Sequence, residues 1–250
     1  MQVTVTEPEL WLRCFHPVPS ASRRLICLPH AGGSASYYLA LSKALSVNVD
    51  VVAIQYPGRQ DRRTERCRES IAELADEIAT VVRPLLADRP LTFFGHSMGA
   101  VLAFEVARRL EAEGIVLTGL FVSGRRAPSA HRDERVHLRD DEGLLAEVRM
   151  LSGTAGQLLE DDEVVRMVLP AIRSDYKAVE TYQYQPGPDV SCPVVALIGT
   201  DDPKVTVDEA MAWSRHTTGE FRLRTFSGGH FYLDSCLPEV VGELARHLGA

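Results

Sequence analysis

Six short apolar runs, each separated from the next by a helical or polar stretch, constrain the fold of this chain more than any other feature. They cover residues 24–29, 49–57, 91–95, 117–124, 192–199 and 220–228. Nearly continuous runs of Val, Ile, Leu and Phe are typical of strands buried on both faces of a sheet. Strands that alternate with helices predict a mostly parallel sheet, covered by helices on both sides and joined by right-handed crossovers.

Between the runs, apolar residues recur at the spacing of an amphipathic helix. In residues 70–86 the pattern contains Pro84, which should end or bend the helix. A second helical pattern ends at Gly114, a residue suited to cap it, and a third closes the chain. Near the N-terminus we expect Trp11 and Phe15 to belong to an additional strand.

Residues 125–190 interrupt the alternation of strands and helices. The stretch is polar and contains two helical patterns, at residues 140–151 and 161–182, followed by a segment rich in Pro and Gly. An insertion of this kind between two sheet strands is most simply a lid. We therefore expect residues 1–250 to form one domain that carries residues 125–190 as an inserted helical lid.

Composition limits the classes of function. Lys and Arg number 27 against 34 Asp and Glu, a formal net charge of -7. Because nucleic-acid binding requires a cationic surface, we expect no nucleic-acid partner. The five cysteines form no CxxC pair and no His/Cys spacing suits zinc, so no metal site is expected.

The absence of a signal-peptide pattern and of any run near the ~18 apolar residues of a membrane span predicts a cytoplasmic, unanchored protein. We expect it to be a monomer.

The run at residues 91–95 leads into GHSMG, residues 95–99, and then directly into a helical pattern. Gly-x-Ser-x-Gly alone is a weak signal, but between a strand and a helix it is typical of the nucleophile elbow of serine hydrolases. The glycines suit a turn too tight for side chains beside a strained serine. Ser97 is therefore the predicted nucleophile, at the carboxyl end of the sheet, where open α/β folds place their sites.

A serine nucleophile needs a base and an orienting acid, which the elbow predicts downstream in the order Ser, Asp or Glu, His. His230 follows a late strand in a Gly-Gly loop and is the predicted base. Asp201 and Asp202 both follow the preceding strand. We favour Asp202, because Pro203 biases it towards an extended conformation and because its spacing from Gly199 is usual in hydrolases of this architecture. Asp201 could instead serve a local capping role.

An oxyanion hole requires two backbone N–H groups. One belongs to the residue after the nucleophile, Met98, and the other to the loop after the first strand of the sheet. LPHAGGSASYY, residues 28–38, fits that loop, and Ala31 is the predicted donor. We interpret His30 as a residue that stabilises the loop by hydrogen bonding rather than as a catalyst.

Five motifs lie in order across nearly the whole chain: LPHAGGSASYY, YPGRQDR, FFGHSMGA, GTDDPKV and GGHFYL. Together they resemble the type II thioesterases associated with modular polyketide synthases and nonribosomal peptide synthetases. The resemblance implies an α/β-hydrolase fold with a mobile helical lid, a triad of Ser97, Asp202 and His230, and oxyanion donors at Ala31 and Met98. It implies hydrolysis of aberrant or stalled acyl groups from the phosphopantetheine arm of acyl or peptidyl carrier proteins, with no metal or redox cofactor.

Two arginine clusters could meet the phosphopantetheine phosphate or an acidic carrier protein. The first arginine cluster consists of Arg59, Arg62, Arg63, Arg66 and Arg68, and the second of Arg125, Arg126, Arg132 and Arg135. Local pairing with neighbouring carboxylates is the alternative for the first cluster, and an ordinary surface is the alternative for the second. Tyr37, Arg59 and Phe231 are the candidate substrate-binding residues, with core packing as the alternative for the two aromatic side chains.

Two other classes of function remain open. The triad chemistry does not distinguish a thioester from an ester, so an esterase or acyl hydrolase acting on free small-molecule esters or thioesters is the main alternative. A silent hydrolase fold used as a binding module is the other, and the complete triad argues against it.

Overall fold

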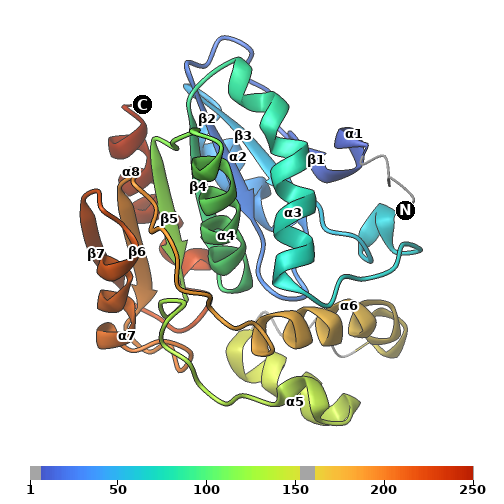
Figure 1. The fold of residues 1–250 in the computed structure, drawn as a ribbon. Coiled ribbons are helices and arrows are strands. Elements are labelled where there is room, and N and C mark those ends of the chain that lie inside the picture. Colours follow the sequence, from blue (N-terminus) through green and yellow to red (C-terminus); the bar gives the residue numbers. More distant parts are fainter. Residues whose placement is uncertain (1–6, 153–160, 250) are drawn as a thin grey trace.

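Seven strands form one sheet in the computed structural model, which describes residues 7–152 and 161–249 (Figure 1). The order across the sheet is β1-β3-β2-β4-β5-β6-β7, and only β1 pairs antiparallel, with β3. The mostly parallel sheet predicted from the apolar runs is confirmed. Its strands are β1 Leu12–Arg13, β2 Arg23–Leu28, β3 Val49–Ile54, β4 Leu91–His96, β5 Gly119–Ser123, β6 Val194–Gly199 and β7 Phe221–Phe226.

The described α-helices lie between and around these strands. They are α1 Pro8–Trp11, α2 Leu39–Leu45, α3 Ile71–Val82, α4 Met98–Ala112, α5 Asp141–Ser152, α6 Asp162–Glu180, α7 Val207–Met211 and α8 Leu237–Leu248. As predicted, α3 ends before Pro84, and the chain continues as a 3₁₀ turn. Past the end of α4, Gly114 has the positive φ of +81° that favours glycine. None of the described helices is long and apolar enough to span a membrane.

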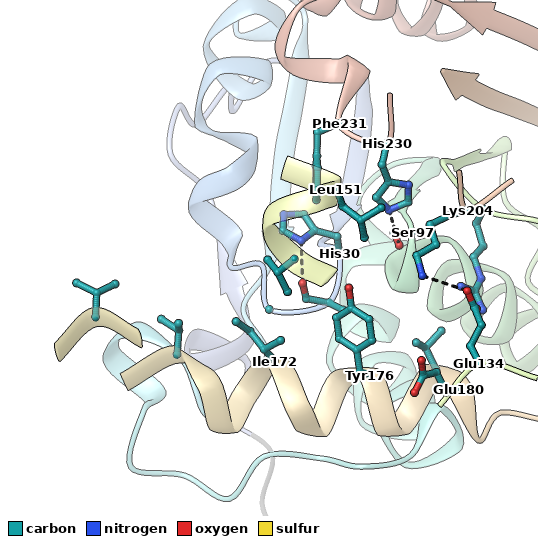
Figure 2. Close-up of a pocket in the computed structure, with 17 residues that line it drawn as sticks. His30, Ser97, Glu134, Leu151, Ile172, Tyr176, Glu180, Lys204, His230 and Phe231 are labelled. Carbon is teal, nitrogen blue, oxygen red and sulfur yellow. Dashed lines mark hydrogen bonds and ion pairs between the residues drawn. The ribbon is translucent and has the colours of Figure 1, made fainter. Parts of the chain in front are cut away.

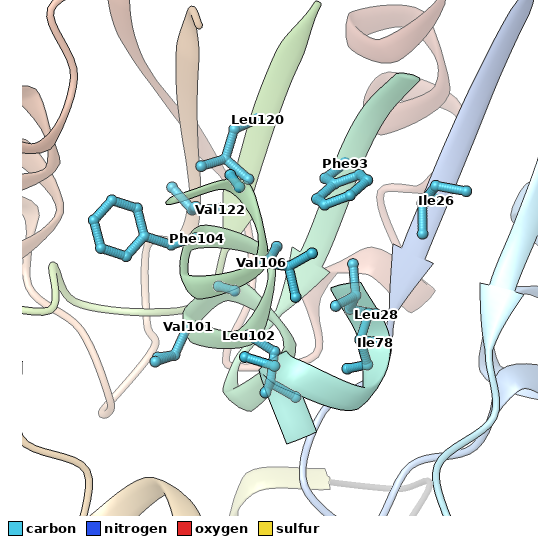
Figure 3. Packing of buried hydrophobic residues seen from close by; sticks show 14 of the residues in the cluster. Ile26, Leu28, Ile78, Phe93, Val101, Leu102, Phe104, Val106, Leu120 and Val122 are labelled. Carbon is cyan, nitrogen blue, oxygen red and sulfur yellow. The ribbon is translucent and has the colours of Figure 1, made fainter. Parts of the chain in front are cut away.

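Helices cover both faces of the sheet, and strand residues alternate between the two resulting cores. In β4, Phe93 packs in the core formed with α3 and α4, whereas Phe94 packs in the core formed with α2 and α8. Figure 3 shows part of the first of these cores, in which Leu102 and Val106 of α4 are buried together with Phe93 and Leu120 of the sheet. Because strands buried on both faces need mostly apolar residues, the runs of β3, β4, β5 and β6 are nearly continuous, whereas the edge strand β7 alternates and is only partly buried.

The N-terminal expectation is wrong in detail. A strand is present, but it is only Leu12–Arg13; Trp11 ends helix α1 and Phe15 lies beyond the strand. Pro8 at the start of the segment favours a helical turn. That turn places the buried Trp11 ring beneath the Arg62 guanidinium, 4.4 Å from the ring centroid.

The two helices predicted in the insertion are present as α5 and α6, and both lie across the carboxyl ends of the strands (Figure 1). The 140–151 pattern corresponds to α5, and the 161–182 pattern to α6; the stretch between them, 153–160, lies outside the described residues. Since active sites of open α/β folds lie at this end of the sheet, the insertion covers the region where the elbow was predicted.

Candidate active site

Ser97 occupies the sharp turn between β4 and α4. Its φ of 54° and ψ of -114° lie outside the usual regions for a residue with a side chain. A Cβ on Gly95 would lie 2.0 Å from the Gly99 carbonyl oxygen, and a Cβ on Gly99 would lie 2.0 Å from that of Leu28. Both positions therefore require glycine. The turn leaves Ser97 partly exposed among fully buried neighbours, as a nucleophile requires.

The hydroxyl of Ser97 lies at the head of a chain of hydrogen bonds. Its Oγ is 3.0 Å from His230 Nε2, and His230 Nδ1 lies 2.9 and 3.0 Å from the two carboxylate oxygens of Asp202. Asp202 is buried, whereas Asp201 is exposed and its carboxylate accepts a hydrogen bond from Thr200. The structure thus brings together the three residues predicted as the triad, and it pairs Asp202 rather than Asp201 with the histidine.

Three buried polar side chains, His96, Ser123 and Tyr232, are linked by hydrogen bonds next to the triad. His96 is fully buried, and its ring centroid lies 5.1 Å from that of His230. His96 Nδ1 is 2.9 Å from the Ser123 hydroxyl, which in turn lies 2.6 Å from the Tyr232 hydroxyl. Burial lowers the pKa of His96 well below its ordinary value, so this ring is neutral at pH 7 and adds no positive charge beneath His230.

The backbone amides of Ala31 and Met98, the predicted oxyanion donors, have no acceptor among the described residues. Met98 begins α4, and first-turn amides have no intrahelical partner. After Ala31, the Gly32 amide donates to Asp175 Oδ2 at 2.7 Å and the Gly33 amide to the His30 carbonyl at 2.9 Å. The Ala31 amide is therefore free to donate to an oxyanion, which is the role predicted for it from the sequence.

His30 fastens this loop. Its Nδ1 lies 3.0 Å from the Ala31 carbonyl oxygen, and its ring contacts Phe231 edge to face at 4.8 Å between centroids. Burial lowers the pKa of His30 to about 4, so the ring is neutral at pH 7. These contacts match the loop-stabilising interpretation of His30.

A cavity of about 330 Å³ opens beside Ser97, between the ends of the strands and the two lid helices (Figure 2). One face of α6 forms much of its wall, because residues four apart on a helix share a face. The lining from α5 and α6 is Val148, Leu151, Val164, Val168, Ile172, Tyr176, Val179 and Glu180, and the lining from outside these two helices includes Ala31, Arg125, Glu134, Lys204 and Phe231.

Of the three candidate substrate-binding residues, only Phe231 lines the cavity, next to His230. Tyr37 does not line it and instead packs behind His30, with 4.7 Å between the ring centroids. Arg59 is also absent from the wall, because its guanidinium is buried in an ion pair with Asp175 and donates to the carbonyls of Gly33 and Pro57.

Most of both arginine clusters is paired locally. Some of the carboxylate partners lie in the same loop as the arginine and others on a packed helix, and the pairs are Arg59–Asp175, Arg62–Glu65, Arg66–Glu73, Arg68–Glu77, Arg126–Glu134, Arg132–Glu209 and Arg135–Asp133. This arrangement favours local pairing as the main role of the first cluster. Arg125 is the exception in the second cluster, since it has no ion pair among the described residues.

Much of the cavity lining had not been singled out from the sequence, and Ile172, Tyr176 and Lys204 are examples. The first two lie four residues apart in the 161–182 helical pattern, which marks one face of a helix but not what that face covers. Lys204 lies in GTDDPKV, two residues after Asp202. The position of α6 over the ends of the strands is what brings Ile172 and Tyr176 to the wall of the cavity.

Known proteins share both this sequence and this arrangement. The thioesterase domain family model matches residues 23–249. Thioesterase PikA5 of Streptomyces venezuelae is 52% identical over 240 residues, which are 96% of this chain and 85% of PikA5. Among solved structures, the type II thioesterase BorB from the borrelidin biosynthetic cluster is 55% identical, with a TM-score of 0.90 over 96% of this chain and 98% of BorB. The RedJ thioesterase from the prodiginine pathway of Streptomyces coelicolor is 35% identical, with a TM-score of 0.86 over 92% of this chain and 88% of RedJ. The chain therefore belongs to the thioesterase family, has the α/β-hydrolase fold and is a thioester hydrolase of the type II group that its five motifs indicated.

Proposed function

We propose that this thioesterase releases aberrant or stalled acyl groups from the phosphopantetheine arm of acyl or peptidyl carrier proteins in polyketide or nonribosomal peptide biosynthesis. The observation that carries the chemistry is the continuous hydrogen-bonded path from Ser97 through His230 to Asp202, beside a cavity roofed by the lid. Relatives named for biosynthetic clusters support the carrier-bound form of the substrate.

In the proposed mechanism, His230 Nε2 takes the proton of Ser97 as Oγ attacks the thioester carbonyl carbon. The amides of Ala31 and Met98 stabilise the oxyanion. The C–S bond then breaks and the pantetheine thiol leaves with the proton from His230. Water, deprotonated by the same histidine, attacks the acyl-serine ester and releases the acid. Asp202 holds the imidazole in the required tautomer throughout, and the proposal requires no metal or redox cofactor.

Acid release from acetyl-, propionyl- and longer acyl-carrier proteins tests this proposal. Wild type should hydrolyse a broad range of carrier-bound acyl groups, and Ser97→Ala should lower kcat by about 10⁴ to 10⁶, as triad deletions do. A free acyl thioester and a free ester of matched chain length serve as controls. Hydrolysis of the free ester, with none of any acyl carrier, would show that the enzyme is a small-molecule esterase instead. Full turnover by Ser97→Ala would exclude the serine mechanism.

A further inference from the structure

The substrate cavity has an apolar end and a polar end. Along the face of α6 the lining changes from Val164 and Val168 through Ile172 to Tyr176 and Glu180. Figure 2 shows the same change, with Glu134 and Lys204 gathered beside Glu180 and away from the apolar end. The acyl chain alone explains an apolar wall, but it does not explain a wall of charged and hydroxyl groups.

Arg125 is the unpaired cation of this polar end. Within residues 7–152 and 161–249 its guanidinium has no hydrogen bond and no ion pair, although the side chain is partly buried and lines the cavity. Its backbone is fixed, because the Arg125 carbonyl accepts a hydrogen bond of 2.9 Å from the buried Trp213 indole. The backbone just before Arg125 lies close to the triad, since a Cβ on Gly124 would lie 3.4 Å from His230 Cε1.

The carboxylates near Arg125 are already occupied. Glu134 pairs with Arg126 and Lys204. Glu180 accepts hydrogen bonds from the backbone amides of Val136 at 3.0 Å and His137 at 2.9 Å. Burial and the charge of Arg126 lower the pKa of Arg125 to about 10, so it keeps its charge at pH 7.

Tyr176 is a second donor without an acceptor. Its side chain is 8% exposed, and no hydrogen bond of its hydroxyl is present in the described part of the chain. Its ring rises from α6 with the hydroxyl directed into the cavity, on the side of Ser97 and His30 (Figure 2). The helix is held in place one residue earlier, where Asp175 pairs with buried Arg59 and accepts from the Gly32 amide.

Both groups line the cavity and have hydrogen-bond donors that no described residue uses. A ligand that displaces water from them must supply acceptors, because an unpaired donor buried by the ligand would cost free energy. We propose, on the basis of the proposed function, that Arg125 and Tyr176 bind a carbonyl oxygen of the substrate. The thioester offers such oxygens in two places. One source is the amides of the pantetheine arm, and the other is an oxygen-bearing acyl chain such as a 3-oxoacyl group.

Three thioesters distinguish these sources: butyryl-pantetheine, 3-oxobutyryl-pantetheine and the butyryl thioester of butanethiol, which has no further carbonyl. We expect Arg125→Met to lower kcat/KM about tenfold and Tyr176→Phe about fivefold on the substrates that supply the oxygen, as loss of a charged and of a neutral hydrogen bond does. Loss on both pantetheine substrates assigns the site to the arm, and loss on the 3-oxobutyryl substrate alone assigns it to the acyl chain. Arg135→Met, the same change at an exposed arginine of the second cluster, should leave all three unchanged.

An equal fall on all three thioesters, or no fall on any, would overturn the proposal. The proposed function is decided separately, by acid release from acyl carriers. If wild type hydrolyses none of the three free thioesters, binding of two non-hydrolysable thioethers, S-butyl-pantetheine and S-(3-oxobutyl)-pantetheine, still decides the inference. Calorimetry should then show that at least one thioether binds the variants more weakly than wild type. Its Kd should rise about tenfold in Arg125→Met and about fivefold in Tyr176→Phe. An unchanged Kd for both thioethers in both variants would refute the site.

Discussion

A buried ion pair between Arg59 and Asp175 holds helix α6 against the loop that contains Ala31 and Gly32. A substitution that breaks this pair tests how much it contributes to the stability of the fold. The side chains of Arg59 and Asp175 are 6% and 1% exposed. Asp175→Asn keeps the shape and can still accept from the Gly32 amide, but it leaves the Arg59 charge uncompensated. Removal of one partner from a buried pair costs about 3–5 kcal/mol. Because Arg59 keeps its hydrogen bonds to the carbonyls of Gly33 and Pro57, we expect a loss near about 3 kcal/mol.

For a chain of this size, each kcal/mol corresponds to about 2–4 °C in Tm, so Asp175→Asn should unfold about 6–12 °C lower than wild type. Thermal and denaturant unfolding measure the change. The matched control is Asp141→Asn, because Asp141 pairs with Arg173 at the surface, where its own side chain is 70% exposed. Surface pairs contribute about 0–1 kcal/mol, so this control should differ little from wild type.

A double variant separates the charge from the packing. Arg59→Met combined with Asp175→Leu replaces the pair with apolar side chains and should recover most of the stability lost in Asp175→Asn, since no buried charge is left unpaired. A loss below about 1 kcal/mol in Asp175→Asn, or a loss no larger than that of Asp141→Asn, would refute the idea that this buried pair holds the lid helix.

Three further expectations follow from the site. Gly99→Ala should destabilise the chain by about 3 kcal/mol in denaturant unfolding, because its Cβ would overlap a carbonyl of β2; a stability equal to wild type would contradict the geometry of the elbow. Asp202→Asn should lower kcat about 10⁴-fold on any acyl thioester, whereas a similar loss in Asp201→Asn would mean that the wrong carboxylate has been assigned. Burial lowers the pKa of His30 to about 4 and that of His96 well below 6.5, so the unfolded chain binds more protons below pH 6.5. The free energy of unfolding should therefore fall from pH 7 to pH 5, and a constant value would show that these rings are not held neutral.

The elements of the fold and the triad were predictable because their signals are local. A buried strand, a Gly-x-Ser-x-Gly turn and a helix occupy consecutive residues, and the glycines on either side of Ser97 are required by contacts within that turn and with β2. His230 and the aspartate follow from chain order, because the ends of parallel strands meet at one edge of the sheet.

Some assignments depended on backbone detail that short patterns do not fix. Asp201 and Asp202 are adjacent and chemically identical, and only the direction of the loop after β6 decides which of them is buried against His230. Trp11 was expected in a strand, but it ends a single helical turn before β1 and is buried there.

The sequence alone determined the fold class, the nucleophile and its base, because these rest on short-range turn chemistry and on the order of strands. The tertiary structure decided what each arginine does, because a charged side chain takes its role from whichever groups surround it. Arg59 was expected near the substrate, and it is instead neutralised by Asp175, a residue 116 positions away in the chain. Arg125 has no such partner and faces the cavity, a difference that appears only when the lid helix lies over the carboxyl ends of the strands.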